Sequence, residues 1–228
     1  MTLFVRTDAN FTVPGLPQVV TEYVPPIDGA AMDFDTSRLA LGALPAWQSS
    51  ISSDVLAVYS GEPQVVEDGG QKAINLDSGS GDMLRVLYSN RVHTSIIVQR
   101  FTDPKPYESV HFGTANGQGY LYVTGRGDNY GAQVGTAGSV FNPPLTPDDR
   151  WHVFVTVNNG ENSFVNIDGQ HQNVSGNTDP RIGYALGWRL AEPYRSDSMY
   201  RRFAIIPEVI SPDRAAAIVG LLMDHYGI

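Results

Sequence analysis

Two neighbouring stretches, Trp151–Val157 (WHVFVTV) and Ser163–Ile167 (SFVNI), decide the fold of this chain. In the first stretch every second residue from Trp151 is apolar, and successive side chains of a β-strand point to opposite faces of a sheet. Residues 158–162 (NNGEN) supply a polar loop between the stretches, and Asp168-Gly169, a favoured tight-turn pair, follows the second one. The pattern predicts two antiparallel neighbouring strands whose aliphatic side chains point into a two-layer interior.

Strand-length apolar segments separated by turn residues continue on both sides of this hairpin. The 23 glycines and 15 prolines are abundant but not periodic, which suits many short strands joined by tight turns. We therefore predict an all-β fold, a two-sheet antiparallel sandwich of roughly ten to fourteen strands. The further strand candidates are Asp54–Tyr59, Lys72–Leu76, Met83–Tyr88, His93–Phe101, Val110–Phe112, Tyr120–Thr124, Arg181–Ala185 and Tyr200–Ile206.

A short helix is predicted at the C-terminal end of the sequence. Ser211 is a suitable N-cap, Pro212 suits the first helical position, and Asp213 interacts favourably with the positive end of the helix dipole. Gly227 is a typical residue for ending such a helix. One helix face is apolar and consists of Ala215, Ile218, Val219, Leu222 and Tyr226.

Residues 1–45 differ from the rest of the chain. They contain five prolines, at positions 14, 17, 25, 26 and 45, and the short apolar pieces between the prolines have no sustained period. Proline removes a backbone donor and favours extended geometry in the residue before it. We interpret residues 1–45 as an extended N-terminal arm that serves anchoring and assembly, and residues 46–228 as the sandwich. The alternative is that the segment completes the edge of the sandwich itself.

Composition excludes several classes of protein. The 228 residues are 42% hydrophobic and carry a formal net charge of −9, whereas proteins that neutralise phosphates carry a positive excess. We therefore expect no nucleic-acid partner and no anionic membrane partner. The lack of cysteine excludes disulfides and thiolate-bound zinc. Residues 1–6 (MTLFVR) do not begin a signal peptide and no apolar stretch is long enough to span a membrane, so we expect a soluble protein.

Three pieces of the sequence, in this order and spacing, resemble a known family. Lys72–Leu76 followed by an acidic, glycine-rich turn and Met83–Val86 is similar to the early strand pair of laminin-G-like, concanavalin-type jelly rolls. The Trp151–Gly169 hairpin resembles the most recognisable hairpin of that family, and Arg202–Arg214 resembles its last strand and terminal helix. The resemblance spans about residues 50–228. It implies a concanavalin-like sandwich that recognises glycans or proteins.

Modules of this family are common on phage particles, where a separate N-terminal segment anchors them. The resemblance therefore implies a phage virion structural protein, a minor tail or capsid-decoration component, that displays a lectin-like module. Its partners would be other virion proteins, bound through the arm, and a host surface glycan. It would be made in the host cytoplasm and reside in the virion. The alternative is a free carbohydrate-binding module or a polysaccharide-cleaving enzyme. Tail or capsid placement and self-association stay open.

Enzymes of the concanavalin type place two carboxylates on a strand with the pattern Glu-x-Asp-x-(x)-Glu. Residues 62–67 (EPQVVE) match this spacing, but Gln64 replaces the middle acid and Pro63 interrupts the strand, so a loop with two solvated acids is predicted. Nucleophile-elbow and phosphate-loop motifs are missing, and the five histidines lack zinc-ligand spacing. We therefore expect a protein that is not an enzyme, without catalytic or metal-binding residues.

Calcium is the one cofactor that the sequence leaves open, because domains of this family often carry an ion at the rim of the sandwich. Calcium prefers six to eight oxygen ligands, but Asp and Asn are also the standard turn formers. The oxygen-rich turns contain Asp77 with Asp82, Asp128 with Asn129, Asp148 with Asp149, and Asn158-Asn159, which we expect to lie opposite Asp168.

Two loops, residues 188–195 and residues 126–130, are predicted to contact a ligand. The reason is that planar aromatic rings stack on sugars and arginine forks bind carboxylates or hydroxyl pairs. The alternative for Trp188 is an aromatic plug at one end of the sandwich. Trp47 and Trp151 are assigned to core packing, and His152 is expected to pack as an ordinary sheet residue. The predicted ligand-binding residues are Trp188, Arg189, Tyr194, Arg195, Asp128, Asn129 and Tyr130.

Overall fold

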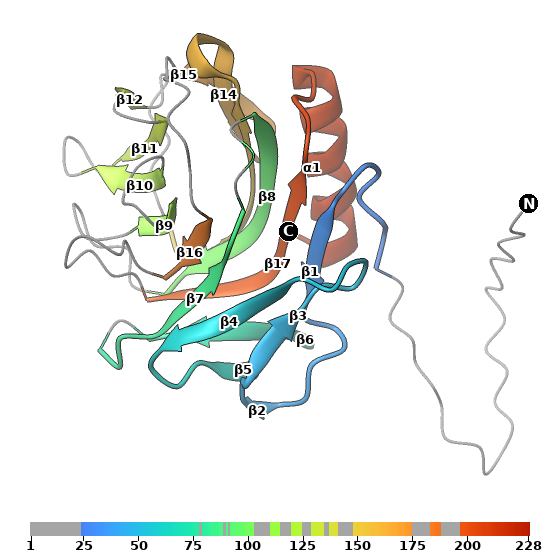
Figure 1. Cartoon of the computed structure of the whole chain (residues 1–228), viewed down its shortest axis with the longest axis vertical. Coiled ribbons are helices and arrows are strands. Elements are labelled where there is room, and N and C mark those ends of the chain that lie inside the picture. The colour runs from blue at the N-terminus through green and yellow to red at the C-terminus, as the bar shows by residue number, and fades with distance from the viewer. Residues whose placement is uncertain are drawn as a thin grey trace, which may run out of the picture.

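The structure is a computed structural model that describes residues 24–228, except for 78, 89, 91, 103–109, 115–119, 125–128, 135–136, 141–147, 175–182 and 188–196. For the strands between residues 110 and 140 it describes the backbone. The described residues form a nine-stranded and an eight-stranded sheet that face each other, with one α-helix against the outside (Figure 1). The predicted all-β sandwich is confirmed, with more strands than the ten to fourteen expected.

The nine-stranded sheet, here called sheet A, is antiparallel and has the strand order β15-β14-β13-β8-β17-β6-β5-β2, with β1 paired to β17. Strands that are far apart in the sequence are neighbours in this sheet, since β1, the first described strand, pairs with β17. The strands of sheet A are β1 (Met32–Asp35), β2 (Gly42–Ala43), β5 (Gln64–Asp68), β6 (Gln71–Leu76), β8 (His93–Phe101), β13 (Trp151–Asn158), β14 (Ser163–Ile167), β15 (Gln170–Val174) and β17 (Ser198–Ile206).

The eight-stranded sheet, here called sheet B, is also antiparallel and has the order β12-β11-β10-β9-β16-β7-β4-β3. A 3₁₀ turn, η1 (Gly160–Asn162), lies between β13 and β14 of sheet A. The strands of sheet B are β3 (Ala46–Gln48), β4 (Val55–Ser60), β7 (Met83–Val86), β9 (Val110–Thr114), β10 (Tyr120–Thr124), β11 (Asn129–Val134), β12 (Ala137–Val140) and β16 (Tyr184–Leu186).

The hairpin that decides the fold is confirmed. β13 and β14 are antiparallel neighbours, with Phe154 opposite Ile167 and Val157 opposite Phe164. The turn after β14 places Asp168 at φ 50° and Gly169 at φ 90°, the left-handed geometry that a two-residue hairpin turn with native twist requires.

The expectation that the valines of this hairpin point between the sheets is wrong. Val153, Val155 and Val157 belong to a second hydrophobic cluster on the outer face of sheet A, whereas Phe154 and Val165 point between the sheets. Alternation along a strand separates two faces but does not say which face meets the partner sheet. Because sheet A is covered on both sides, the more uniformly aliphatic face of β13 was free to pack against the helix.

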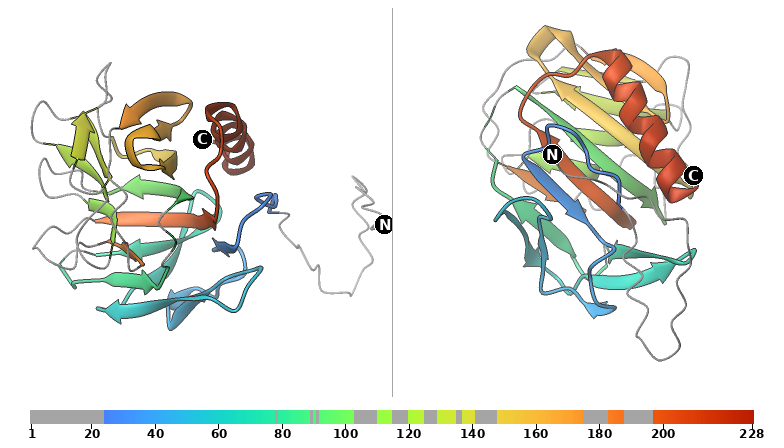
Figure 2. Two further views of the ribbon diagram at one scale, coloured as in Figure 1. Left: turned by 45° about the horizontal axis from the view of Figure 1, so that its top comes forward. Right: turned by 90° about the vertical axis from the view of Figure 1, so that its right-hand side faces the viewer.

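The helix α1 (Pro212–Tyr226) covers that outer face, and it packs over β13 and β14 (Figure 2). The Ser211 hydroxyl accepts a hydrogen bond from the Arg214 amide, and Gly227 ends the helix at φ 67°. Its buried residues are the five predicted ones: Ala215, Ile218, Val219, Leu222 and Tyr226.

The N-terminal segment is described from residue 24 onward, and from Met32 it belongs to the sandwich. β1 pairs with β17, and the carboxylate of Asp33 binds the guanidinium of Arg202 with both residues buried. β2 pairs with β5 at the edge of sheet A. Residues 32–43 thus complete the sheet edge, as the alternative interpretation of the sequence has it. Residues 1–23 lie outside the described part of the chain, so their anchoring role stays a prediction.

Candidate functional site

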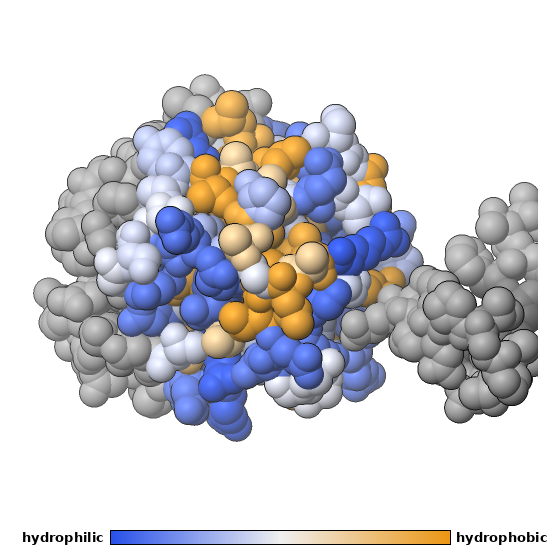
Figure 3. Space-filling model, turned by 90° about the horizontal axis from the view of Figure 1, so that it is seen from below, coloured by the Kyte–Doolittle hydropathy of each residue, from blue (hydrophilic) through white to orange (hydrophobic). Residues whose placement is uncertain are grey.

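The outer faces of the two sheets differ in what covers them. Sheet A lies under α1, whereas β4 and β7 of sheet B expose a shallow groove of about 560 Å³. Figure 3 views the side of the molecule that carries β2 to β5, and hydrophobic residues gather near its middle. The groove is lined by Ser53, Asp54, Val55, Ala57, Val58, Tyr59, Arg85, Val86 and Leu87.

Alternation along β4 creates the apolar part of this groove. Leu56 is fully buried between the sheets, whereas Val55 and Tyr59 point outward and are 37% and 53% exposed. Tyr59 is the extra residue of a β-bulge, because Val58 pairs with Leu84 but Ser60 already pairs with Met83. Bulges re-aim a side chain relative to the flat sheet. Alternation thus turns Tyr59 to the outer face, and the bulge leaves it without a paired residue on β7.

Arg85 lies over the Tyr59 ring. It is opposite Ala57 in the β4–β7 ladder, and its guanidinium carbon is 5.5 Å from the centroid of the tyrosine ring. The side chain is partly buried, and its Nε is buried without a hydrogen-bond partner. Leu87, which is 65% exposed, extends the apolar wall beyond the arginine. The aliphatic stem of Arg85 and the ring of Tyr59 thus form an apolar surface that also carries the positive charge of the guanidinium.

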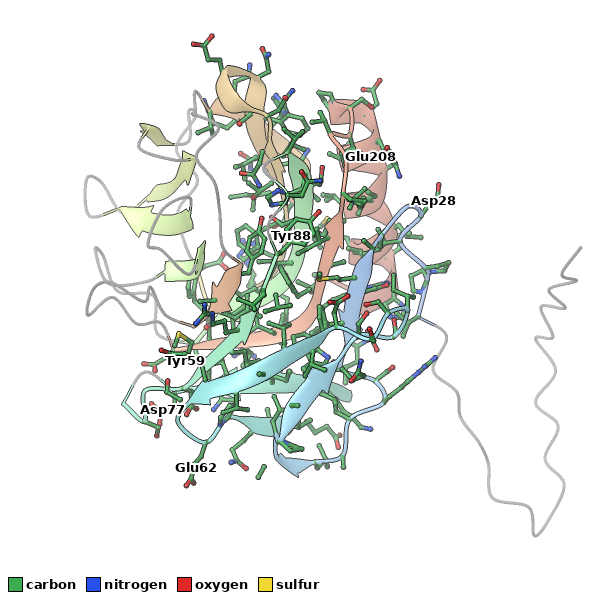
Figure 4. All side chains as sticks on the ribbon, in the orientation of Figure 1. Asp28, Tyr59, Glu62, Asp77, Tyr88 and Glu208 are labelled. Carbon is green, nitrogen blue, oxygen red and sulfur yellow. The ribbon has the colours of Figure 1, made fainter. Side chains whose placement is uncertain are left out.

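A buried carboxylate holds the backbone that follows Tyr59. Asp82 accepts hydrogen bonds from the Glu62 amide at 2.7 Å and from the Asp77 amide at 3.0 Å. A Cβ on Gly61, which has φ 74°, would come within 2.1 Å of the Asp82 carboxylate, so only glycine fits there. Figure 4 shows Tyr59 and the Asp77 turn side by side at this end of the sandwich. The tyrosine is therefore presented by a rigid turn.

The other end of the groove carries a carboxylate. Asp54, just before β4, accepts a hydrogen bond from the Ser52 hydroxyl at 2.7 Å. Gln48 on β3 donates to the Asp54 backbone carbonyl at 3.0 Å. The groove thus offers an aromatic ring and a cation at one end and hydrogen-bond acceptors at the other.

Most of the ligand-binding residues predicted from the sequence lie outside the described residues: Trp188, Arg189, Tyr194, Arg195 and Asp128. Asn129 and Tyr130 begin β11, which three strands separate from β7. β16 ends at Leu186, and it pairs directly with β7. The chain therefore enters segment 188–196 from the strand beside the groove. Because both predicted loops lie mostly outside the described residues, the prediction for them stays untested.

Sequence reasoning missed Tyr59 and Arg85 as site residues. The available signal was an aromatic residue at an outward position of the run 54–59, followed by turn residues.

The prediction of a loop at residues 62–67 (EPQVVE) is wrong, because Gln64–Asp68 forms strand β5. Pro63 lies just before that strand, where its missing N–H costs no ladder bond. Glu62 and Glu67 are both exposed.

The oxygen-rich turns act as turn formers wherever they are described. Asp77 accepts from the Gly79 amide and the Ser80 hydroxyl, in the manner of an Asx turn. The expectation that Asn158 lies opposite Asp168 is wrong: Asn158 pairs with His93 at one end of β13, whereas Asp168 bonds Val153 near the other end. Among the described residues, no group of three or more His, Asp or Glu side chains is arranged to hold a metal ion.

His152 is more than an ordinary sheet residue, which corrects the sequence interpretation. Its buried ring lies between two carboxylates, with Nδ1 2.5 Å from Asp168 and Nε2 2.9 Å from Asp148. Burial alone lowers the pKa of His152, but the hydrogen bonds and charges of Asp168 and Asp148 outweigh it and raise this pKa. Burial opposes the shift of Asp148 as well, yet bonds from Arg150 and His152 lower the Asp148 pKa to about 2. The cluster ties the hairpin turn to β13.

The two tryptophans assigned to core packing differ. Trp47 is fully buried between the sheets, as predicted, and its indole nitrogen donates to the Asp35 carbonyl. Trp151 is only partly buried against the helix-side cluster; its indole nitrogen donates to Asp68, and the Arg201 guanidinium stacks 4.1 Å from the ring centroid.

Within the described residues, no helix has the length and apolar character needed to cross a bilayer.

The fold and the exposed groove define an antiparallel β-sandwich module with an open outer face. No protein-family model matches the chain, and no curated protein sequence matches it significantly. Among solved structures, domain 4 of AbnA, a GH43 extracellular arabinanase from Geobacillus stearothermophilus in complex with arabinotriose, is similar with a TM-score of 0.59 and 13% identity. The match covers 83% of this chain and 98% of that domain.

Two further similar structures are larger proteins. The binding domain of botulinum neurotoxin DC in complex with rat synaptotagmin II has a TM-score of 0.64 at 9% identity, over 86% of this chain and 52% of that one. Trypanosoma rangeli sialidase in complex with the inhibitor DANA has a TM-score of 0.60 at 12% identity, over 85% of this chain and 33% of that one. The chain thus spans about half of the neurotoxin binding-domain chain and a third of the sialidase chain. At such identities the likeness establishes the β-sandwich fold.

Proposed function

We propose that this protein is a carbohydrate-binding β-sandwich module that binds a glycan in the Tyr59 groove. The observation that carries the proposal is the half-exposed Tyr59 ring, held on a bulge beside Arg85 on the uncovered face of sheet B. An aromatic ring offers a flat apolar surface for the C–H face of a sugar, and adjacent polar groups fix its orientation. A rigid turn behind the ring lowers the ordering cost of binding.

Two of the similar structures are described with a carbohydrate ligand, which supports the proposed ligand class. The AbnA domain is described with arabinotriose, and another structure of the neurotoxin binding domain is described in complex with SialylT. The same toxin domain also binds synaptotagmin II, so a protein ligand is the competing outcome. A groove of about 560 Å³ with polar and apolar lining residues fits a glycan better than the large, mostly apolar contact of a stable protein complex.

A glycan array probed with the full chain tests the proposal, and Tyr59→Ala provides the decisive variant. We expect saturable binding by the wild type and its loss in the variant. Leu221→Ala removes an exposed apolar side chain from α1 and is the matched control, which should bind like the wild type. Equal binding by Tyr59→Ala and wild type would contradict the proposed groove.

Binding without cleavage is part of the proposal. Incubation with the glycans that bind should produce no new reducing ends. The appearance of such ends would favour the polysaccharide-cleaving alternative.

The virion role stays a proposal that depends on residues 1–23. Since residues 32–43 complete sheet A, the informative truncation removes residues 1–23 and leaves β1 in place. If the segment anchors the module to a particle, the truncated protein should fold and bind glycan but fail to be incorporated. Normal incorporation would count against the anchor.

A further inference from the structure

Arg85 is the cation that lines the groove, and among the described arginines that are not exposed it alone has no carboxylate partner. Elsewhere in the described residues, arginines that are buried or partly buried pair with carboxylates: Arg100 and Arg201 with Asp68, Arg202 with Asp33, and Arg214 with Glu208.

Arg38 is the other described arginine without an ion pair or hydrogen bond, and it is exposed to water. Arg85 instead lies partly buried in the groove, and its Nε is buried and unbonded. A guanidinium nitrogen that loses water without gaining an acceptor, as Nε of Arg85 does, is destabilising in the free protein. An anionic group of a ligand would supply the hydrogen-bond acceptor that the Arg85 guanidinium lacks.

The geometry beside Arg85 indicates which anion fits. The Arg85 guanidinium lies over the Tyr59 ring, 5.5 Å from its centroid, so a sugar ring that packs against the remaining exposed surface of Tyr59 would have its substituents near the guanidinium. The planar fork of arginine matches a planar carboxylate with two parallel hydrogen bonds. A polyanion is a poor fit, because the protein carries a net charge of −9 and Asp54 lies at the other end of the groove. One carboxylate per bound unit is the pattern that the charges favour.

We infer that the groove selects a glycan with a carboxylated sugar, whose ring stacks on Tyr59 and whose carboxylate binds Arg85. This inference rests on the proposed carbohydrate-binding function and specifies its ligand class. A sugar acid of the uronic type and one of the sialic type share this chemistry, so the test contains both.

The experiment measures the affinity of the full chain for matched probes by titration calorimetry. The pairs are galacturonic acid with its methyl ester, and sialyllactose with its methyl ester, so that each pair differs only in the charge of one carboxylate. At least one carboxylated probe should bind about tenfold more tightly than its neutral counterpart, the size of one charge-assisted hydrogen bond. The pair that shows the preference identifies the source of the sugar acid.

Three variants separate the contributions. Arg85→Gln should reduce binding of the acid to that of the neutral probe and leave neutral binding unchanged, and Arg85→Lys should restore part of the preference. Arg38→Gln removes the same charge outside the groove and should change nothing. Circular dichroism confirms that each variant is folded.

Each outcome is decisive. Equal binding of acid and neutral probes by the wild type, or a preference that survives Arg85→Gln, would overturn the inference while leaving the carbohydrate-binding function intact. Binding of no probe of either kind would count against both the inference and the proposed function. Tighter binding of a sulfated counterpart would overturn the assignment of a carboxylate.

Discussion

The two outer faces of the sandwich differ in what happens to their side chains. On sheet A, the outward valines of β13 are fully buried beneath α1 and join a cluster of aliphatic residues. On sheet B, the outward residues Val55 and Tyr59 of β4 stay exposed, although they follow the same alternation. The same strand pattern thus produces a second core on one side and an open surface on the other.

The charges of the two faces differ in the same way. Beneath the helix side, Arg202 is bound by both carboxylate oxygens of Asp33, and burial of the Tyr226 hydroxyl next to Asp35 raises the Tyr226 pKa. On the open side Arg85 has no such partner among the described residues. We conclude that the covered face stabilises the fold, whereas the open face leaves Val55 and Tyr59 exposed. Substitutions should separate the two roles.

The largest effect is expected from Asp33→Ala on the covered face. The change leaves the Arg202 guanidinium buried without its acceptor, which should reduce the free energy of unfolding by about 3–5 kcal/mol. Urea denaturation measures it. Asp28→Ala, at an exposed position, is the control and should stay within about 0.5 kcal/mol of wild type. Similar small losses in both variants would show that the pair is dispensable.

Leu222→Ala should come next. Leu222 is fully buried between α1 and sheet A, so its truncation should cost about 2–5 kcal/mol through lost transfer energy and a residual cavity. The adjacent Leu221 is 42% exposed, and Leu221→Ala should be nearly neutral in the same denaturation experiment. Equal losses would mean that the helix is not docked as described.

A smaller effect is expected from pH. Because Asp168 and Asp148 raise the pKa of His152 above 6.5, protonated His152 stabilises the folded state fully below that value, and this contribution disappears as pH rises through the folded pKa. Stability attributable to Asp148 is present above 3.8 and is lost as pH falls through about 2.

His152→Gln isolates the histidine contribution. The difference in unfolding free energy between wild type and variant should shrink from about pH 6 to about pH 9 in denaturation curves. A difference that is constant or grows over this range would be incompatible with a raised His152 pKa. The variant also tests whether the open face is independent, since its glycan binding should not change.

The smallest change in stability is expected from Tyr59→Ala, the variant with the largest change in binding. The ring is half exposed and Asp82 holds the following turn through backbone amides, so the unfolding free energy should fall by less than about 1 kcal/mol. A loss as large as that of Leu222→Ala would assign Tyr59 to the fold and remove the contrast between the two faces.

Much of the fold could be predicted because the deciding signals are local. The helix cap at Ser211, the stop at Gly227 and the buried face of α1 follow from neighbouring residues that interact along one helix. The strand candidates agree with the structure within one or two residues at most of their ends, as for β8 (His93–Phe101). The Asp168-Gly169 turn likewise needs only its own two residues.

The groove could not be predicted because its parts come from distant segments. Tyr59 and Arg85 become neighbours only when β4 pairs with β7, and the support from Asp82 requires two turns to meet. The His152 cluster likewise joins a strand to the turn at Asp168 and to Asp148 before the strand. Pairing register places these groups together, and register depends on the whole sheet.

By itself, the sequence of this protein determined that strands and one C-terminal helix would form, and where most of the turns would fall. Those properties depend on local periodicity and capping. Only the tertiary structure decided that the valine face of β13 packs under the helix, that β1 joins β17, and that Arg85 lies over the Tyr59 ring. The reason is that burial and ion pairing depend on which faces meet, and strands with the same alternation can meet on either face.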